Sequence, residues 1–389
     1  MRIALDASPL ILAPKTGVGR YTFYLGSALL ELRNAPDVVF FYGTHWSDRL
    51  TDLAARRGNG SHVSVRKHVS ALLPEPWKRW LRRRVLQGGF TAARPAVFHA
   101  TNYVAYAFEV PVVATVHDLS FLRFPENHPS KRLAWLDQHL PKTLTRAAHI
   151  IVPSSFTRKE LLSLFPVDSS RVAVVYEGVS SQFRPRNHEE AAGVLREFNL
   201  PWKGYILSVG TLEPRKNLVA LLRAYDALPE SLKGRWPLVV VGGSGWKDGA
   251  VRREMRLLMA RGQLRYLGSV PHDTLACLYA AASLFVYPSR YEGFGLPPLE
   301  AMASGTPTVV SNRASLPEVA GGAATLIDPD DEESLARTLE SLLEDPAKLQ
   351  AMAKLGLDRA RGFTWDACAR NTVEIYEQAA GAAASAPGS

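Results

Sequence analysis

The sequence contains only two cysteines, Cys277 and Cys368, and neither has a second Cys or a His at the spacing of a metal site. This scarcity excludes a disulfide framework and a zinc signature, and it favours a reducing compartment such as the cytoplasm. No apolar run approaches the roughly 20 residues that cross a bilayer. The apolar start of the chain contains Asp6 and lacks a cleavage-site pattern, which predicts a first strand and not a signal peptide.

Two nucleotide-binding signatures are also missing. The chain has neither the GxGxxG of dinucleotide-binding folds, which disfavours a dehydrogenase, nor the Gly-Lys-Ser/Thr of a P-loop. It also lacks an acidic triplet typical of a metal site. The 46 basic residues exceed the 37 acidic ones and give a net charge of +9, which suits an acidic partner. Because no nucleic-acid-binding motif accompanies this charge, we expect an anionic lipid or a phosphorylated substrate, and no nucleic acid.

The length of 389 residues is too great for one ordinary core and predicts two domains. Short apolar runs alternate with helical patterns, restart after a polar segment, and alternate again, which indicates two doubly wound, Rossmann-like α/β domains. The predicted strands are residues 2–6, 38–42, 62–67, 97–100, 112–117, 150–153 and 172–176, then 205–209, 237–241, 264–267, 283–287, 307–310 and 324–327.

The domain boundaries follow from composition. We predict a first domain at residues 1–180, a Pro- and charge-bearing linker at 181–203, and a second domain at 204–362. A helix at 363–380 and a disordered, alanine-rich tail at 381–389 complete the chain. In the first domain, a helical pattern from residue 21 to residue 32 follows a long loop.

The stretch at residues 286–310 combines a strand, a glycine-broken loop, a helix opened by two prolines, and a second strand. Gly293 and Gly295 allow the backbone to approach a ligand closely. The helix N-terminus that follows presents free N–H groups to an anion. Glu292 and Glu300 bracket the loop, and their carboxylates suit sugar hydroxyls. The stretch therefore predicts a site for a phosphorylated sugar.

Three further segments carry candidate residues. Arg215 and Lys216 follow the first strand of the second domain and could clamp a diphosphate, although a solvated pair of loop cations is the alternative. Gly17-Val18-Gly19-Arg20 precedes a helix and could face a phosphate or a sugar, or simply form a tight turn. His117 ends a predicted strand, where ligands bind in open α/β sheets, but a lone His after a strand is more often a hydrogen-bonding residue of the loop.

Residues 74–86 form a predicted helix with tryptophans on one face and basic residues around the others. This composition is typical of an interfacial helix on an anionic membrane. A solvated helix with one face in the core is the alternative. The residues assigned to the membrane surface are Trp77, Lys78, Arg79, Trp80, Arg82 and Arg83.

Together these segments carry a resemblance. The spacing Glu292-x7-Glu300 around GFGLPPL, the loop ending in Arg215-Lys216-Asn217, the GVGR segment and His117-Asp118 resemble the large retaining glycosyltransferase family 4. The resemblance covers residues 2 to about 378. It implies the GT-B fold, in which two Rossmann-like domains face each other and the last helix crosses back to the first, acceptor-binding domain. It also implies a hexosyltransferase that uses a nucleotide-diphosphate sugar and retains the anomeric configuration, without a metal ion or cofactor.

The resemblance also assigns roles. Arg215 and Lys216 would hold the donor diphosphate as it leaves, Glu292 would contact the donor sugar, and His117 would lie beside it. Glu300 would bind the ribose, and the region around Gly268 and Val270 would contact the base. The full set of implied donor-binding residues is Gly17, Gly19, Gly210, Gly268, Val270, Phe294, Gly295, Leu296 and Glu300.

The segments at residues 99–129 and 150–161 are similar to mannosyl- and rhamnosyltransferases of bacterial surface-polysaccharide assembly. That similarity implies a GDP-linked hexose donor and a glycan or lipid-diphosphate-linked glycan acceptor, with the enzyme peripheral on the cytoplasmic face of the inner membrane. A UDP-sugar, a soluble small acceptor, or a non-catalytic sugar-binding role remain alternatives.

Overall fold

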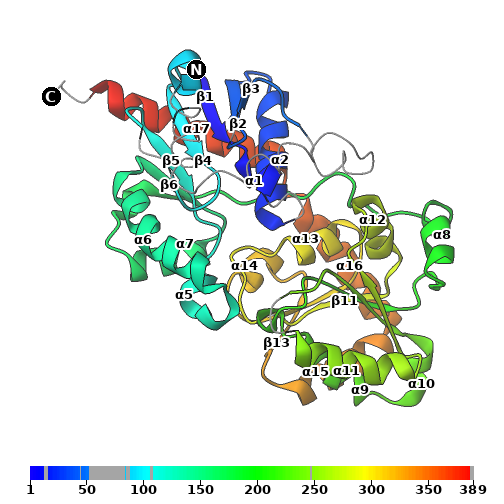
Figure 1. The fold of residues 1–389 in the computed structure, drawn as a ribbon. Coiled ribbons are helices and arrows are strands. Elements are labelled where there is room, and N and C mark those ends of the chain that lie inside the picture. Colours follow the sequence, from blue (N-terminus) through cyan, green and yellow to red (C-terminus); the bar gives the residue numbers. More distant parts are fainter. Residues whose placement is uncertain are drawn as a thin grey trace, which may run out of the picture.

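The computed structural model describes residues 1–12, 16–43, 45–51, 84, 88–105, 108–245 and 248–385. Two largely parallel sheets, each covered by helices on both faces, lie one above the other in Figure 1. The predicted α/β class with two Rossmann-like domains is therefore confirmed. The predicted strand at 62–67 lies outside the described residues, and so does the predicted helix at 74–86 except for Arg84.

The first sheet has the order β3-β2-β1-β4-β5-β6-β7. All neighbouring strands are parallel except β2 and β3, which pair antiparallel at the edge. The central strands β4 and β5 are fully buried, as expected for parallel strands covered on both faces. The strands are β1 (Arg2–Asp6), β2 (Asp37–Phe41), β3 (Trp46–Ser47), β4 (Val97–Ala100), β5 (Val112–Thr115), β6 (His149–Val152) and β7 (Val172–Val174).

The second sheet has the order β10-β9-β8-β11-β12-β13 and is parallel throughout. The order reverses between β8 and β11, which is the point where doubly wound sheets bind ligands. The strands are β8 (Ile206–Val209), β9 (Leu238–Val241), β10 (Leu264–Gly268), β11 (Leu284–Tyr287), β12 (Thr308–Ser311) and β13 (Thr325–Ile327).

Helices cover both faces of each sheet. The first domain contains α1 (Ser8–Leu12), α2 (Gly17–Glu31), α5 (Ser120–Arg123), α6 (Ser130–Arg146) and α7 (Ser155–Leu164). The rest of the chain contains α8 (His188–Glu197), α9 (Leu218–Asp226), α10 (Glu230–Arg235), α11 (Gly249–Ala260), α12 (His272–Ala281), α13 (Leu296–Ala303), α14 (Leu316–Ala320), α15 (Glu332–Leu343), α16 (Pro346–Ala360) and α17 (Trp365–Ser385). In the second domain, α12, α13 and α14 cover the face toward the first domain, and α9, α11 and α15 cover the opposite face (Figure 1).

Two adjacent segments connect the domains. Val179 N donates to Phe363 O at 3.1 Å, so the outgoing and the returning chain run side by side. After this crossing, α17 packs on the core of the first domain beside α2, β4 and β5 (Figure 1). The buried hydroxyl of Tyr376 on α17 lies 2.7 Å from Nδ1 of His99 at the centre of that sheet. The predicted return of the last helix to the first domain is confirmed.

Two expected boundaries are wrong. The helix expected from residue 21 begins at Gly17, because the side chain of Thr16 accepts the N–H of Gly19 and caps the first turn. The tail expected to be disordered from residue 381 continues as helix to Ser385, because alanine has the highest helix propensity and extends α17.

Candidate active site

The charged residues of the candidate site come from two neighbouring strands. Arg215 and Lys216 lie in the loop after β8, and Glu292 lies in the loop after β11. Strands β8 and β11 pair in parallel, so both loops leave the same edge of the sheet at the point where the strand order reverses. The topology therefore brings together side chains 76 and 77 positions apart in sequence.

Glu292 is the centre of this cluster and is only 8% exposed. Lys216 Nζ donates to its Oε1 at 2.7 Å, and Arg215 Nη1 donates to its Oε2 at 3.1 Å. The hydroxyls of Tyr287 and Ser289 donate to Oε1 at 2.9 and 2.6 Å. The same Lys216 ammonium also donates to the Tyr287 hydroxyl at 2.7 Å. Both cations and the carboxylate are thus held in fixed positions.

The three groups control one another's ionisation. Burial alone would raise the pKa of Glu292, but the charges of Lys216 and Arg215 lower it to about 2, so the carboxylate is ionised. Burial and the neighbouring Arg215 lower the pKa of Lys216, and Glu292 opposes them only in part. The pKa of Arg215 is raised, because Glu292, Asp118 and Glu213 outweigh its burial. A diphosphate that enters this site would compete with carboxylates for both cations.

The N-terminus of α13 faces the same edge. Among the residues that the structure describes, no acceptor is found for the backbone N–H groups of Phe294, Gly295 and Leu296. Gly295 has φ +130°, a conformation that side-chain-bearing residues rarely adopt. These amides and the helix dipole form an arrangement suited to phosphate or sugar oxygens.

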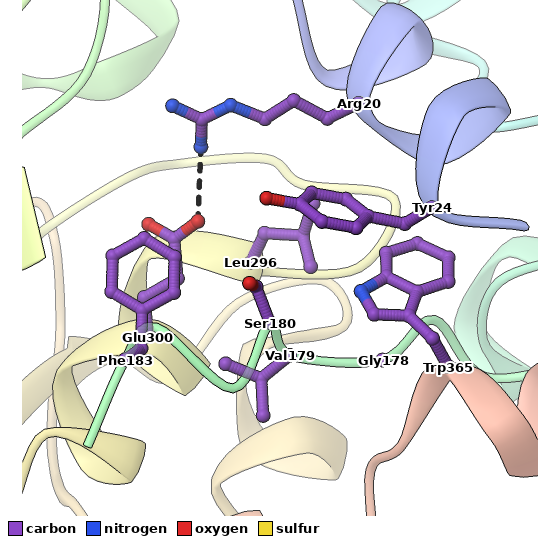
Figure 2. A pocket seen from close by; sticks show the side chains of 9 residues that line it. All are labelled: Arg20, Tyr24, Gly178, Val179, Ser180, Phe183, Leu296, Glu300 and Trp365. Atoms are coloured by element: carbon purple, nitrogen blue, oxygen red, sulfur yellow. Dashed lines mark hydrogen bonds and ion pairs between the residues drawn. The ribbon is translucent and has the colours of Figure 1, made fainter. Parts of the chain in front are cut away.

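Glu300 lies one turn along α13 and is 3% exposed. Its Oε1 accepts from Arg20 Nη1 at 2.9 Å, and its Oε2 accepts from the Tyr279 hydroxyl at 3.1 Å. Burial raises the pKa of Glu300, and Arg20 opposes that shift. Because Arg20 belongs to α2, this ion pair joins the two domains (Figure 2). Gly17 and Gly19 form the first turn of α2, before Arg20.

His117 lies in the loop just after β5, in the first domain. Its Nε2 lies 2.8 Å from the carbonyl of Thr101 and so carries the proton, and its Nδ1 lies 3.6 Å from Glu177 Oε1. The backbone of Gly293 lies directly against it, since a Cβ at position 293 would be 1.9 Å from His117 O. Both ring nitrogens therefore face protein acceptors, which favours a positioning role over proton transfer.

Asp118 was not among the predicted site residues, although it directly follows His117. Its Oδ1 accepts from the Tyr103 hydroxyl at 2.9 Å and from both the N–H and the hydroxyl of Ser120 at 3.0 and 2.9 Å. Burial would raise the pKa of Asp118, but Arg215 and the Ser120 hydrogen bonds lower it overall. The first domain thus presents an ionised carboxylate to Arg215. In the sequence, the only sign of a role for Asp118 was its position next to His117.

The remaining predicted donor-binding residues lie along the edge of the second sheet. Gly210 follows β8 and lines a hollow of about 250 Å³ together with Lys216 and Tyr287. Gly268 ends β10 with φ +64°, and Val270 follows it before α12. Both lie at the carboxyl edge of the second sheet, at the end of β10, which β9 separates from β8.

The predicted membrane-surface residues Trp77, Lys78, Arg79, Trp80, Arg82 and Arg83 lie outside the described residues. Within the described ranges, none of the helices combines the length and the apolar character needed to cross a bilayer.

The two domains contact each other through side chains that the sequence did not single out. Ser154 and Thr157 of the first domain donate to Gly293 O at 2.6 and 3.1 Å. Glu318 on α14 accepts from the backbone N–H groups of Ser155 and Phe156 at 2.8 and 3.1 Å. The two partners of each contact lie 136 to 163 positions apart in the sequence, so no local pattern could reveal these contacts.

Comparison with known proteins agrees with this architecture. The chain matches the family models "Glycosyltransferase Family 4" over residues 15–183 and "Glycosyl transferases group 1" over residues 197–358. It is 36% identical over 383 residues to O-antigen chain mannosyltransferase B of Escherichia coli, covering 97% of this chain and 100% of that protein. It is 28% identical over 337 residues to O-antigen chain mannosyltransferase RfbU of Salmonella typhimurium, covering 85% and 88%.

Among solved structures, sucrose-phosphate synthase of Thermosynechococcus elongatus is similar over 98% of this chain and 100% of that chain. The TM-score is 0.73 at 24% sequence identity, which shows a shared fold. Both the family models and the full-length relative agree with the resemblance found in the sequence. The chain belongs to glycosyltransferase family 4 and is a glycosyltransferase with the GT-B fold.

Proposed function

We propose that the chain is a retaining, metal-independent mannosyltransferase that uses GDP-mannose and extends a lipid-linked glycan in surface-polysaccharide assembly. The names of two relatives, both O-antigen chain mannosyltransferases, support the sugar and the pathway class. The proposed place of action is the cytoplasmic face of the inner membrane. That part rests on the composition of residues 74–86, with tryptophans among basic residues.

The observation that carries the proposal is the Glu292–Arg215–Lys216 cluster beside the free N-terminus of α13. The two cations and the backbone amides suit a diphosphate. Once the cations turn to the diphosphate, the ionised Glu292 has acceptor positions for hydroxyls of the attached sugar. Glu300 lies four residues after Leu296, on the same side of α13 and about 6 Å along its axis. A ribose on Glu300 would therefore place its diphosphate near the helix N-terminus.

The proposed chemistry uses only the side chains and the backbone amides of this cluster. The bond between the anomeric carbon and the diphosphate breaks, and Arg215, Lys216 and the amides of α13 stabilise the charge that develops on the leaving oxygen. The acceptor hydroxyl forms its bond to the same face of the anomeric carbon and gives its proton to a diphosphate oxygen. The products are the α-linked glycan and GDP. Asp118 and His117 hold the first-domain side of the cleft in place.

A panel of GDP- and UDP-linked sugars, tested for consumption with a lipid-linked glycan acceptor, tests the proposal. We expect turnover with GDP-mannose, an α-linked product by NMR, and full activity after dialysis against EDTA. Glu292→Ala should abolish transfer while the protein still melts cooperatively. Preference for a UDP-sugar or a soluble acceptor would overturn the assigned substrates, and binding without turnover of any donor would indicate a non-catalytic protein.

A further inference from the structure

A second hollow lies between the domains, away from the Arg215–Lys216 cluster. Its empty space of about 200 Å³, part of it open to solvent, lies where α2, the crossing segment at 178–183, α13 and the start of α17 meet (Figure 2). The space inside it is small, so a ring would enter it only when the two domains move apart. Its walls are mixed: Tyr24, Phe183 and Trp365 are aromatic, and Arg20 and Glu300 are charged.

Trp365 has an unsatisfied hydrogen-bond donor in this hollow. Its side chain lines the wall and the residue is only 8% exposed, yet its indole Nε1–H is closed off from solvent and has no acceptor among the described residues. The ring cannot easily turn away, because it stacks on Tyr24 at 5.4 Å and packs edge-on against Tyr21 at 6.1 Å. In Figure 2 the indole nitrogen is turned into the hollow. Buried donors without partners are rare in folded proteins and call for an explanation.

Glu300 stands on the other side of the hollow with acceptor capacity to spare. A carboxylate has about four acceptor positions. Arg20 and the Tyr279 hydroxyl occupy one on each oxygen. The hollow therefore offers acceptors on one side, an N–H donor on the other and aromatic walls between them. A ring with two adjacent hydroxyls complements this arrangement, because each hydroxyl both donates and accepts.

We propose that Trp365 is a specificity-determining residue whose indole N–H donates to one ribose hydroxyl of the donor nucleotide, while Glu300 holds the neighbouring hydroxyl. This inference rests on the proposed function, in which Glu300 binds the ribose. The ribose is favoured over an acceptor sugar because Glu300 lies one helical turn from the amides proposed to hold the diphosphate.

The arrangement also makes the nucleotide a link between the domains. Trp365 packs in the core of the first domain, whereas Glu300 is buried on α13 in the second. Because the walls of the hollow come from both domains, separation of the domains would admit the nucleotide. Closure would then satisfy the indole N–H through the ribose, so the nucleotide would stabilise the closed state by binding it more tightly than the open one.

The test is a double-mutant cycle between Trp365 and the ribose hydroxyls. Binding of GDP, 2′-deoxy-GDP and 3′-deoxy-GDP is measured by calorimetry for the wild type and for Trp365→Phe, which keeps an aromatic ring without the N–H. For GDP we expect the Kd of Trp365→Phe to rise about 2- to 10-fold, the value of one hydrogen bond. For the analogue that lacks the contacted hydroxyl, the two proteins should bind equally.

Equal weakening of all three ligands by Trp365→Phe would show that the indole only packs, and would overturn the inference. So would unchanged binding of GDP. If the variant does not fold, the wild type alone still decides, because equal affinity for GDP and both deoxy analogues would also overturn it. Trp202→Phe is the control, at a half-buried tryptophan outside the hollow. It should leave the Kd ratios between GDP and the two deoxy analogues unchanged. Failure of the wild type to bind either GDP or UDP would instead contradict the proposed function itself.

Discussion

The two sides of the cleft are built on similar sheets but differ in charge and in their hydrogen-bond partners. On the second-domain side, Arg215, Lys216 and Glu292 form one buried, ionised cluster. On the first-domain side, His117 and Asp118 bond mainly to their own domain, and hydroxyls of Ser154 and Thr157 reach across to a backbone carbonyl. From this comparison we expect the second domain to supply most of the electrostatics of the proposed reaction, and the first domain to supply closure and orientation.

If the second domain supplies the electrostatics, removal of one cation should have the largest effect. Lys216→Gln removes a charge that lies 2.7 Å from Glu292 Oε1, and we expect kcat/KM to fall about 10²- to 10³-fold, as for loss of a preorganised electrostatic contact. Steady-state kinetics with the preferred donor measures it. Lys203→Gln is the matched control, because the Lys203 ammonium donates to Ala282 O outside the cluster. Less than tenfold loss at Lys216 would contradict the division of roles.

If the first domain supplies closure, an added side-chain atom where the two domains touch should cause the next largest loss of activity. Gly293→Ala would place a Cβ 1.9 Å from His117 O, so the loop must move away from the first domain. We expect kcat/KM to fall about 100-fold, since a displacement near 1 Å at a reaction centre can cost that much. Each domain should still fold, which circular dichroism checks.

Gly193→Ala in α8 is the control for this substitution, because a Cβ there meets nothing within 4 Å. It should leave activity unchanged. Activity of Gly293→Ala within a factor of three of the wild type would show that the close approach of the two loops is not needed for turnover.

The contrast between the sides also separates what the sequence could predict from what it could not. Residues 205–209 and 283–287 were predicted within one residue of β8 and β11, because strands buried on both faces are continuous apolar runs. Arg215, Lys216 and Glu292 were singled out as candidates because their loops follow such strands. The start of α2 was missed, because its glycines resemble a loop until the cap from Thr16 is seen.

The first-domain contacts were not predictable for a different reason. Ser154, Thr157 and Glu318 each bond to a partner in the other domain. The role proposed for Trp365 depends on an indole N–H that has no acceptor among the described residues. Local patterning reports which face of an element is buried, not which distant residue covers it. These contacts depend on how the two domains are placed against each other.

The charge of Lys216 predicts a pH dependence that arises from the second-domain side. Burial and Arg215 lower the pKa of Lys216, so its ammonium loses the proton at a lower pH than an ordinary lysine. Activity should therefore decline as pH rises, before the ordinary lysine value of 10.5 is reached. In Lys216→Arg the alkaline decline should disappear, because a guanidinium keeps its charge. A pH–rate profile of kcat/KM for both proteins measures it, and identical alkaline limbs would contradict the assignment.

The smallest expected effect concerns the contact at the N-terminus of α7. Glu318 accepts the N–H groups of Ser155 and Phe156, the first two residues of α7, while Ser154 accepts that of Thr157 at 3.1 Å. A helix N-terminus in the first domain is thus capped by a carboxylate from the second, which the helix dipole favours. Glu318→Gln keeps a hydrogen-bond acceptor but removes the charge, and should weaken closure by about 1 kcal/mol, or about fivefold in kcat/KM.

Because this cap joins the domains and lies apart from the Arg215–Lys216 cluster, its loss should act on closure and not on the chemical step. Added salt should weaken the wild-type contact and narrow the difference between the two proteins. Steady-state kinetics at low and high ionic strength tests this, with Glu333→Gln on the exposed face of α15 as the control. A fivefold loss that does not change with salt would mean that Glu318 acts through packing, and the first domain would then close on the second without electrostatic help.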